Sequence, residues 1–211
     1  MRVKNIRVQS RAARPRLLCW DDKSSEGCLI PPLKSLDLQP HLKGKLVELC
    51  PLQPGHWDDL FVAASDPLIW ELHPESDRYK KEVFRTFFDG AIESGGAFVV
   101  LDAKSKRVIG STRFHGYDPK KSEIEIGWTF LERKYWGGRY NLEMKQLMLA
   151  HAFKFVQQVV FYVGQENLRS QKATEKIGAV KSGMREKIYG DRPPSLNFRY
   201  VIKKPLEKGA T

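Results

Sequence analysis

The spacing of apolar residues along the chain predicts a domain built from both helices and strands. Three runs rich in β-branched and aromatic residues, 97–102, 107–117 and 123–131, are separated by turn residues, so we expect three strands in an antiparallel meander. An amphipathic helix is predicted before them, where apolar residues recur at helical spacing at Val83, Phe84, Phe87, Phe88, Ala91 and Ile92. Ser76 or Asp77 is the expected N-cap of this helix.

The second half of the chain predicts a helix between two parallel strands. A helix over 142–156 is expected, with a stripe of Leu142, Gln146, Leu149, Phe153 and Val156 that Met148 and Phe155 widen. The continuously apolar run 159–163 is typical of a buried strand that lies parallel to the strand at 123–131. The intervening helix would then form a right-handed crossover. Closing strands are expected at 181–189 and 198–203.

The beginning of the chain differs in character from the rest. A short strand is predicted at Leu46, Val47 and Leu49, and Pro54 opens a helix that ends at Asp66-Pro67. The residues before this strand are basic and lack a clear period. We therefore divide the chain into a basic arm and linker (1–42), a folded domain (43–204) and a C-terminal tail (205–211).

The charge of the chain leaves two classes of partner open. Net charge is +11, which by itself suggests an acidic partner such as nucleic acid. Residues 1–45 hold ten Lys/Arg and four Asp/Glu, or +6, so the rest carries 26 minus 21, or +5. One hypothesis is thus a basic RNA- or ribosome-binding protein that uses this leader, although no RNA-recognition motif supports it. Because about half of the excess lies on this leader, nucleic acid is the less favoured partner, and the remaining +5 is compatible with binding a phosphorylated small molecule.

Cysteine usage predicts neither a disulfide framework nor a metal site. Cys19, Cys28 and Cys50 are an odd number, and no CxxC or HExxH spacing occurs. We therefore expect no metal and a reducing, cytoplasmic location. No apolar run is long enough to predict a membrane-spanning helix.

The stretch 123–141 carries the first chemical signal. The predicted strand Glu123–Leu131 is followed by the pair Gly137-Gly138 and then by the long helix. A glycine-bearing turn at a helix start presents free backbone N–H groups at the positive end of the helix dipole. This arrangement is typical of a phosphate site.

A second stretch makes the pattern specific. Asn167-Leu168-Arg169-Ser170 is followed by Glu175-Lys176-Ile177-Gly178-Ala179, with Asn167 as helix cap. Together with Glu125-Ile126-Gly127-Trp128 and Trp136-Gly137-Gly138, this stretch resembles the GNAT superfamily of N-acetyltransferases, and most closely its RimJ/RimL-type branch of ribosomal-protein N-terminal acetyltransferases. The resemblance covers about residues 43–204. It implies an α/β (α+β) GNAT fold: a mixed, mostly antiparallel twisted sheet of six to seven strands, about four flanking helices and one splayed parallel strand pair.

The resemblance also implies acetyl-CoA as acetyl donor and coenzyme A as product. The pantetheine arm is expected on the unpaired end of the strand at Trp128, Thr129, Phe130 and Leu131, and the pyrophosphate on the glycine turn. The family loop has its flanking positions at Lys134 and Arg139 here, and Arg139 stands where a small residue is usual. The expected cofactor-binding residues are Trp128, Thr129, Phe130, Leu131, Lys134, Trp136, Gly137, Gly138, Arg139, Tyr140, Asn141, Asn167 and Ser170.

Two residues are candidates for catalysis. At pH 7 roughly one terminal α-amine in ten is neutral against about one lysine in 2,500, so an N-terminal acceptor needs little help from a base. Glu125 is the expected base, through a water, and by alternation it shares a face with Glu123 and Gly127, opposite Ile124, Ile126 and Trp128. Many family members have a tyrosine acid where Thr174 stands here, so the role would pass to Ser170 or to solvent. His115 is a second candidate base.

The acceptor is expected to be a peptide N-terminus or a small amine. Trp70, His73, Arg113 and Tyr189 are the expected substrate contacts, with Arg78 a further candidate. The basic balance of the chain disfavours polyamines and aminoglycosides, which would need an acidic cleft. Coenzyme A binding without catalysis remains an alternative, and the resemblance suggests a homodimer.

Overall fold

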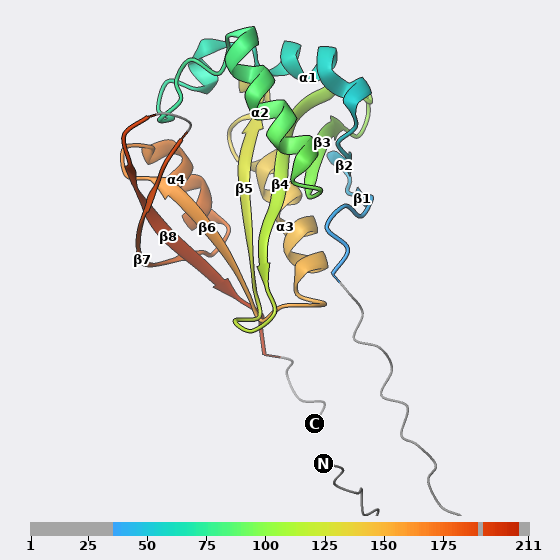
Figure 1. Cartoon of the computed structure of the whole chain (residues 1–211). Helices are drawn as coiled ribbons and strands as arrows, with labels where there is room; N and C mark the ends of the chain where they lie inside the picture. The colour runs from blue at the N-terminus through green and yellow to red at the C-terminus, as the bar shows by residue number, and fades with distance from the viewer. Residues whose placement is uncertain (1–35, 190–191, 207–211) are drawn as a thin grey trace, which may run out of the picture. The chain divides into compact units, whose positions relative to one another are not determined.

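The computed structural model describes residues 36–189 and 192–206. Within them one eight-stranded sheet has the order β1-β2-β3-β4-β5-β6-β8-β7 (Figure 1). The strands are β1 (Leu42–Lys43), β2 (Val47–Pro51), β3 (Ala97–Asp102), β4 (Val108–Asp118), β5 (Glu123–Leu131), β6 (Gln158–Gly164), β7 (Val180–Lys187) and β8 (Ser195–Lys203). The predicted meander is confirmed as β3, β4 and β5.

The mixed sheet predicted from the sequence is confirmed. β5 and β6 are parallel, and the other neighbouring strands pair in an antiparallel manner. The number of strands exceeds the expected six to seven because the two-residue β1 pairs with β2 at the sheet edge. Such a short edge pair has too little apolar pattern to be found from the sequence.

In the part of the chain that the structure describes, four α-helices cover the two faces of the sheet: α1 (Trp57–Ala64), α2 (Lys81–Glu93), α3 (Arg139–Ala152) and α4 (Leu168–Lys176). α1 and α2 pack on one face, where the predicted stripe of α2 buries Phe84 and Phe88. α3 packs on the other face through Met144 and Met148 (Figure 1). Burial of side chains of this size stabilises the fold by about 1.5–3 kcal/mol each.

Two details of the predicted helices are wrong. α2 begins at Lys81 without a side-chain cap, because the turns at 71–80 intervene and the Asp77 carboxylate instead pairs with Arg192. In α3 the predicted stripe residues Leu142 and Gln146 are exposed, and the buried positions are Met144, Lys145, Met148, Leu149, His151 and Ala152. The buried face is therefore rotated from the one inferred for 142–156, and the helix runs from Arg139 to Ala152.

Part of the predicted linker contacts the folded domain. Leu36, Leu38 and Leu42 pack against the α3-side core, and the Gln39 side chain donates a hydrogen bond of 2.9 Å to the Ala97 carbonyl. The chain divides into two units, 1–33 and 34–211. The first lies outside the described residues, so the predicted basic arm, with Cys19 and Cys28, and the limits of the domain stay predictions. No helix among the described residues is long and apolar enough to cross a membrane.

Candidate active site

β5 and β6 separate after three paired positions. Glu123, Ile124 and Glu125 oppose Gln158, Val159 and Val160, and beyond this point the strands diverge (Figure 1). Where they diverge, the two strands border a cleft of about 710 Å³, which we call the interstrand cleft. It is lined by residues of the α1–α2 connection, β5, the start of α3, β6 and α4, and by Tyr189. The predicted splay is therefore present, and one wall of the cleft is a strand edge without a partner strand.

The start of α3 forms one end of this cleft. Gly137 and Gly138 have φ of 99° and 116°, which L side chains rarely adopt, so the glycine pair is required for the turn. The first bond of the helix runs from the Leu142 N–H to the Gly138 carbonyl (2.8 Å), leaving the N–H groups of residues 139–141 ahead of it. With Arg139 at the same helix start, this end suits a polyphosphate. Lys172 and Lys176 of α4 add two further cations to the lining of the cleft.

Most residues predicted to bind the cofactor lie together in the interstrand cleft. Those that line it are Trp128, Thr129, Phe130, Leu131, Trp136, Gly137, Gly138, Arg139, Asn141, Asn167 and Ser170. Lys134 and Tyr140 do not. The Lys134 ammonium lies 3.0 Å from the Glu132 carboxylate, and the Tyr140 hydroxyl donates to Asp102 at 3.3 Å. Both side chains therefore serve contacts away from the cleft.

A β-bulge in β5 changes which residues face the two helix layers. Ser111 of β4 opposes Phe130, whereas Arg113 opposes Gly127, so three steps along β5 match two along β4. Trp128, at φ 50°, sits in this bulge. Ile126 packs in the α3-side core, whereas Trp128 contacts the α1–α2 core. The expectation that Trp128 lies opposite Glu125 is wrong, because the alternation skips one residue here.

Glu125 is buried beside the cleft and does not line it. Its carboxylate lies 2.6 Å from the Lys187 ammonium, which itself lies 5.0 Å from the Trp128 ring centroid. The carboxylate, the ammonium and the indole are thus on one face of the sheet. His115, the other candidate base, is exposed and stacks edge-on against Trp128. A base role for Glu125 stays a prediction, and it requires exchange of Lys187 for a water or the amine.

The N-terminus of α4 brings the second motif to the cleft. The Asn167 side-chain oxygen accepts a hydrogen bond from the Ser170 N–H at 3.0 Å, so Asn167 is a helix cap. Ser170 and Thr174 both line the cleft, and Thr174 is buried. The Ser170 hydroxyl is consequently placed among the groups that could donate to a leaving thiolate, which remains a predicted role.

Three of the four residues expected to contact the acceptor line the cleft, where the α1–α2 connection and Tyr189 form its wall, here the acceptor end. Trp70, His73 and Tyr189 line it, together with Arg78. The His73 ring packs edge-on against both Trp70 and Tyr189. Arg113 does not line the cleft and lies behind Trp128, with its guanidinium 4.7 Å from the ring centroid. Burial lowers the pKa of Arg113 to about 10 and holds the pKa of His73 well below its usual value.

Lys145 is a cleft residue that sequence reasoning missed. It lies on α3 and is buried, and its ammonium contacts the Thr129 and Thr112 hydroxyl oxygens at 2.5 and 3.3 Å. Burial lowers its pKa to about 7. The signal was present in the spacing, because Lys145 precedes the buried Leu149 by four residues and so lies on the same helix face.

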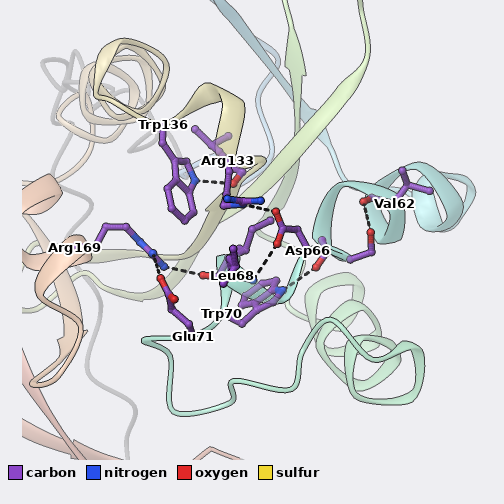
Figure 2. A network of polar contacts seen from close by, with 12 residues as sticks. Val62, Asp66, Leu68, Trp70, Glu71, Arg133, Trp136 and Arg169 are labelled. Atoms are coloured by element: carbon purple, nitrogen blue, oxygen red, sulfur yellow. Dashed lines mark hydrogen bonds and ion pairs between the residues drawn. The ribbon is translucent and has the colours of Figure 1, made fainter.

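A polar network joins the rims of the cleft (Figure 2). Arg169 of α4 donates to the Ile69 carbonyl at 2.9 Å and to the Glu71 carboxylate at 3.0 Å, and its guanidinium stacks on Trp136 at 4.1 Å. The Trp136 indole N–H donates to the Leu131 carbonyl at 2.9 Å. The last carbonyl of β5 is therefore engaged by a side chain. No role was predicted for Arg169, because its partners Ile69 and Glu71 lie about 100 residues earlier in the chain and local sequence patterns do not reveal such contacts.

Comparison with known proteins identifies the class of fold and site. The model of the acetyltransferase (GNAT) domain family matches residues 47–180. No curated protein sequence is significantly similar to the chain. A solved acetyltransferase structure from T. thermophilus is 27% identical, covers 77% of this chain and 88% of its own, and has a TM-score of 0.64.

Two more distant structures share the fold. One is a ribosomal-protein-serine acetyltransferase from Vibrio cholerae, at 11% identity and TM-score 0.65, covering 78% of this chain and 98% of its own. The other is the microcin C7 self-immunity acetyltransferase MccE in complex with acetyl-CoA and AMP, at 10% identity and TM-score 0.65, covering 80% and 99%.

The family match extends over more than half of the chain, and the cleft fits the chemistry of that family. The chain belongs to the GNAT acetyltransferase family and is an acyltransferase. Members of this family transfer acetyl from acetyl-CoA, and three features suit that molecule: the unpaired edge of β5, the apolar walls and the helix start with its cations. The predicted homodimer and the roles assigned to individual residues stay predictions.

Proposed function

We propose that this protein transfers the acetyl group of acetyl-CoA to a primary amine, by direct attack within a ternary complex. The observation that carries the proposal is that one continuous cleft is lined both by the α3 start and by the aromatic end around Trp70 and Tyr189. Two substrates entering from these ends would meet at the bulge of β5. Cys50, the one cysteine within the described range, lies on β2 and does not line the cleft, which argues against a cysteine-bound acetyl intermediate.

Binding in the proposed mechanism uses backbone groups and cations. The N–H groups at the start of α3, with Arg139, would hold the pyrophosphate, and the free edge of β5 at Trp128 and Thr129 would pair with the amides of the pantetheine arm. Such pairing would fix the thioester carbonyl beside Trp128.

Proton transfer would use the two candidates from the sequence. Glu125 would take the proton of the attacking amine through a water, and Ser170 would donate a hydrogen bond to the thiolate as it leaves. An acceptor with an α-amine depends least on proton removal by Glu125, because about one such amine in ten is already neutral at pH 7. A peptide N-terminus or a small molecule with an amine of similar pKa is therefore the favoured acceptor.

A RimJ/RimL-like role is the finer assignment that we propose within the family. It is supported by the two sequence motifs and by the shared fold of the Vibrio cholerae ribosomal-protein-serine acetyltransferase. We propose the cytoplasm as its location, since the substrate acetyl-CoA is available there. A direct contact of the basic leader with RNA or ribosome would be an additional property of residues outside the described range.

The proposal is tested by measuring thiol release from acetyl-CoA and the mass of the product, with a panel of N-terminal peptides and small amines. Calorimetric titration of acetyl-CoA is run in parallel. Turnover with a mass gain of one acetyl group is expected for some acceptor. Binding of acetyl-CoA with no turnover on peptides, amino acids or amines would favour a coenzyme A-binding role without catalysis, and absence of binding would overturn the assignment of the cleft.

A further inference from the structure

Cationic and aromatic side chains alternate from the acceptor end of the cleft into the protein behind it. The Arg78 guanidinium lies 5.3 Å from the Trp70 ring centroid and 4.7 Å from that of Phe87. Arg113 follows between Phe87 and Trp128, at 5.8 and 4.7 Å. Both arginines are at least nine-tenths buried, with exposed fractions of 5% and 6%. Two desolvated guanidinium groups thus stack on Trp70 and Trp128, which line the cleft, and on Phe87 behind them.

These arginines retain hydrogen-bonding capacity that the protein does not use. Within the described residues, the Nε atoms of Arg78 and Arg113 are the only buried side-chain nitrogens or oxygens that lack a partner. A buried unpaired donor of a charged group costs about 1–3 kcal/mol or more, so native proteins rarely keep one without a reason. Both occur around the single ring of Phe87, so the protein itself leaves the two guanidinium groups of this cluster incompletely satisfied.

His73 and Arg78 present two donors to the same space. His73 Nδ1 accepts a hydrogen bond from the Glu75 N–H at 2.9 Å, and because the ring is neutral, its proton is on Nε2. Nε2 lies 3.4 Å from Arg78 Nη1, so two N–H donors face each other without an acceptor between them. Both residues line the cleft, and an oxygen atom of a bound molecule could accept from both.

The charges at this end of the cleft do not balance. The Arg78 guanidinium pairs with Glu75, and Lys187 pairs with Glu125. Arg113 donates only to the Gly90 carbonyl at 3.1 Å, and in the described part of the chain no carboxylate forms an ion pair with it. Arg192 is neutralised by Asp77. The acceptor end therefore carries one excess positive charge in a poorly solvated setting, which favours an anion.

We propose that the acceptor amine belongs to a molecule that also carries an oxyanion, a carboxylate or a phosphate, and that Arg78 and His73 bind this group with Arg113 supplying charge behind it. This inference rests on the proposed transfer to an amine and narrows its substrate class. The same positive field disfavours an ammonium at the reacting position, so it would increase the neutral fraction of the attacking amine. Polycationic acceptors would be excluded by charge.

The test compares acceptors that differ in one charged group. The pairs are serine with serinamide, the peptide amides Ser-Asp-Gly and Ser-Asn-Gly, and phosphoethanolamine with ethanolamine. Binding of each is measured by calorimetry in the presence of coenzyme A, and turnover is measured separately with acetyl-CoA. We expect the anionic member of at least one pair to bind tenfold or more tightly, and the pair that responds distinguishes carboxylate from phosphate.

Variants assign the preference to the named residues. Arg78→Gln should reduce the preference for the anionic member over the neutral one by about 10- to 100-fold relative to the wild type. His73→Phe, which keeps an aromatic ring but removes the Nε2 donor, is the second variant in case the loss of the Glu75 ion pair prevents folding. Arg85→Gln is the control, because Arg85 is exposed and stacks on Trp57 at 3.3 Å, away from the cleft lining.

The outcomes separate this inference from the proposed function. Equal or weaker binding of the anionic members in all pairs, including no detectable binding, would overturn it. So would an unchanged preference in both Arg78→Gln and His73→Phe. An anion preference in binding without any turnover would leave this inference standing and contradict the transfer reaction instead.

Discussion

The Nζ atom of Lys145 lies 2.5 Å from the Oγ1 atom of Thr129, inside the protein and without a carboxylate as ion-pair partner among the described residues. Burial lowers the pKa of Lys145 to about 7, against 10.5 for an exposed lysine. The unfolded chain therefore binds a proton more tightly than the folded protein between these two values. The stability cost of the buried ammonium is fully present below pH 7 and declines as pH rises towards 10.

We predict that Lys145→Met stabilises the protein at pH 7 by several kcal/mol, since each pKa unit corresponds to about 1.4 kcal/mol. The gain should fall by roughly half by pH 9, because the wild type gains stability over this range and the variant does not. Urea unfolding at pH 7, 8 and 9 measures both effects. Lys154→Met, at an exposed position beyond the same helix, is the control and should change stability little. A gain that is independent of pH would show that Lys145 is not a desolvated ammonium.

Gly138 should be required for cofactor binding more than for folding. Its φ of 116° is strained for any side chain, and alanine there should shift the N–H groups at the start of α3. We predict that Gly138→Ala weakens acetyl-CoA binding by about tenfold or more, measured by calorimetry. Gly95→Ala is the matched control, because Gly95 also has positive φ (58°) but lies at the end of α2, outside the cleft. Equal effects of both substitutions on affinity would contradict a phosphate site at Gly138.

Arg169 should hold the α1–α2 connection against α4. Figure 2 shows Arg169 between Glu71 and Trp136. The Arg169–Glu71 pair is partly exposed, so Arg169→Met should lower the free energy of unfolding by only about 0–1 kcal/mol. Amide hydrogen exchange over residues 66–73 should nevertheless accelerate severalfold, because the variant loses the Arg169 contacts that join α4 to the α1–α2 connection. Arg85→Met, which removes a comparable ring contact on α2, should leave exchange in 66–73 unchanged. Unaltered exchange in Arg169→Met would show that the rim is held by its own turns.

The parts of the site that the sequence could predict are those fixed by local backbone chemistry. The Gly137-Gly138 turn, the Asn167 cap and the limits of β3 and β5 follow from residue types over a few positions, and the structure has them there. The bulge at Trp128 could not be predicted, because it is an offset between β5 and β4 that only the pairing of two strands defines. The ion pair of Glu125 with Lys187 likewise depends on β7, far along the chain.

This same ion pair decides how Glu125 should be tested. Removing one charge leaves the other buried and unpaired, so a loss of activity in Glu125→Gln alone could reflect disorder of Lys187. The double variant Glu125→Gln/Lys187→Met removes both charges and is the structural control. If Glu125 is the base, both variants should lose about 100-fold or more in turnover at pH 7.

The pH profile then distinguishes a base from a positioning residue. An α-amine acceptor becomes largely neutral above pH 8 without help, so the deficit of both variants should shrink steadily between pH 7 and pH 9. A deficit that stays constant over this range, or that the double variant repairs at pH 7, would assign Glu125 to holding Lys187 and Trp128 in place. Turnover with a peptide acceptor at saturating acetyl-CoA is the measurement, since it separates this effect from changes in cofactor affinity.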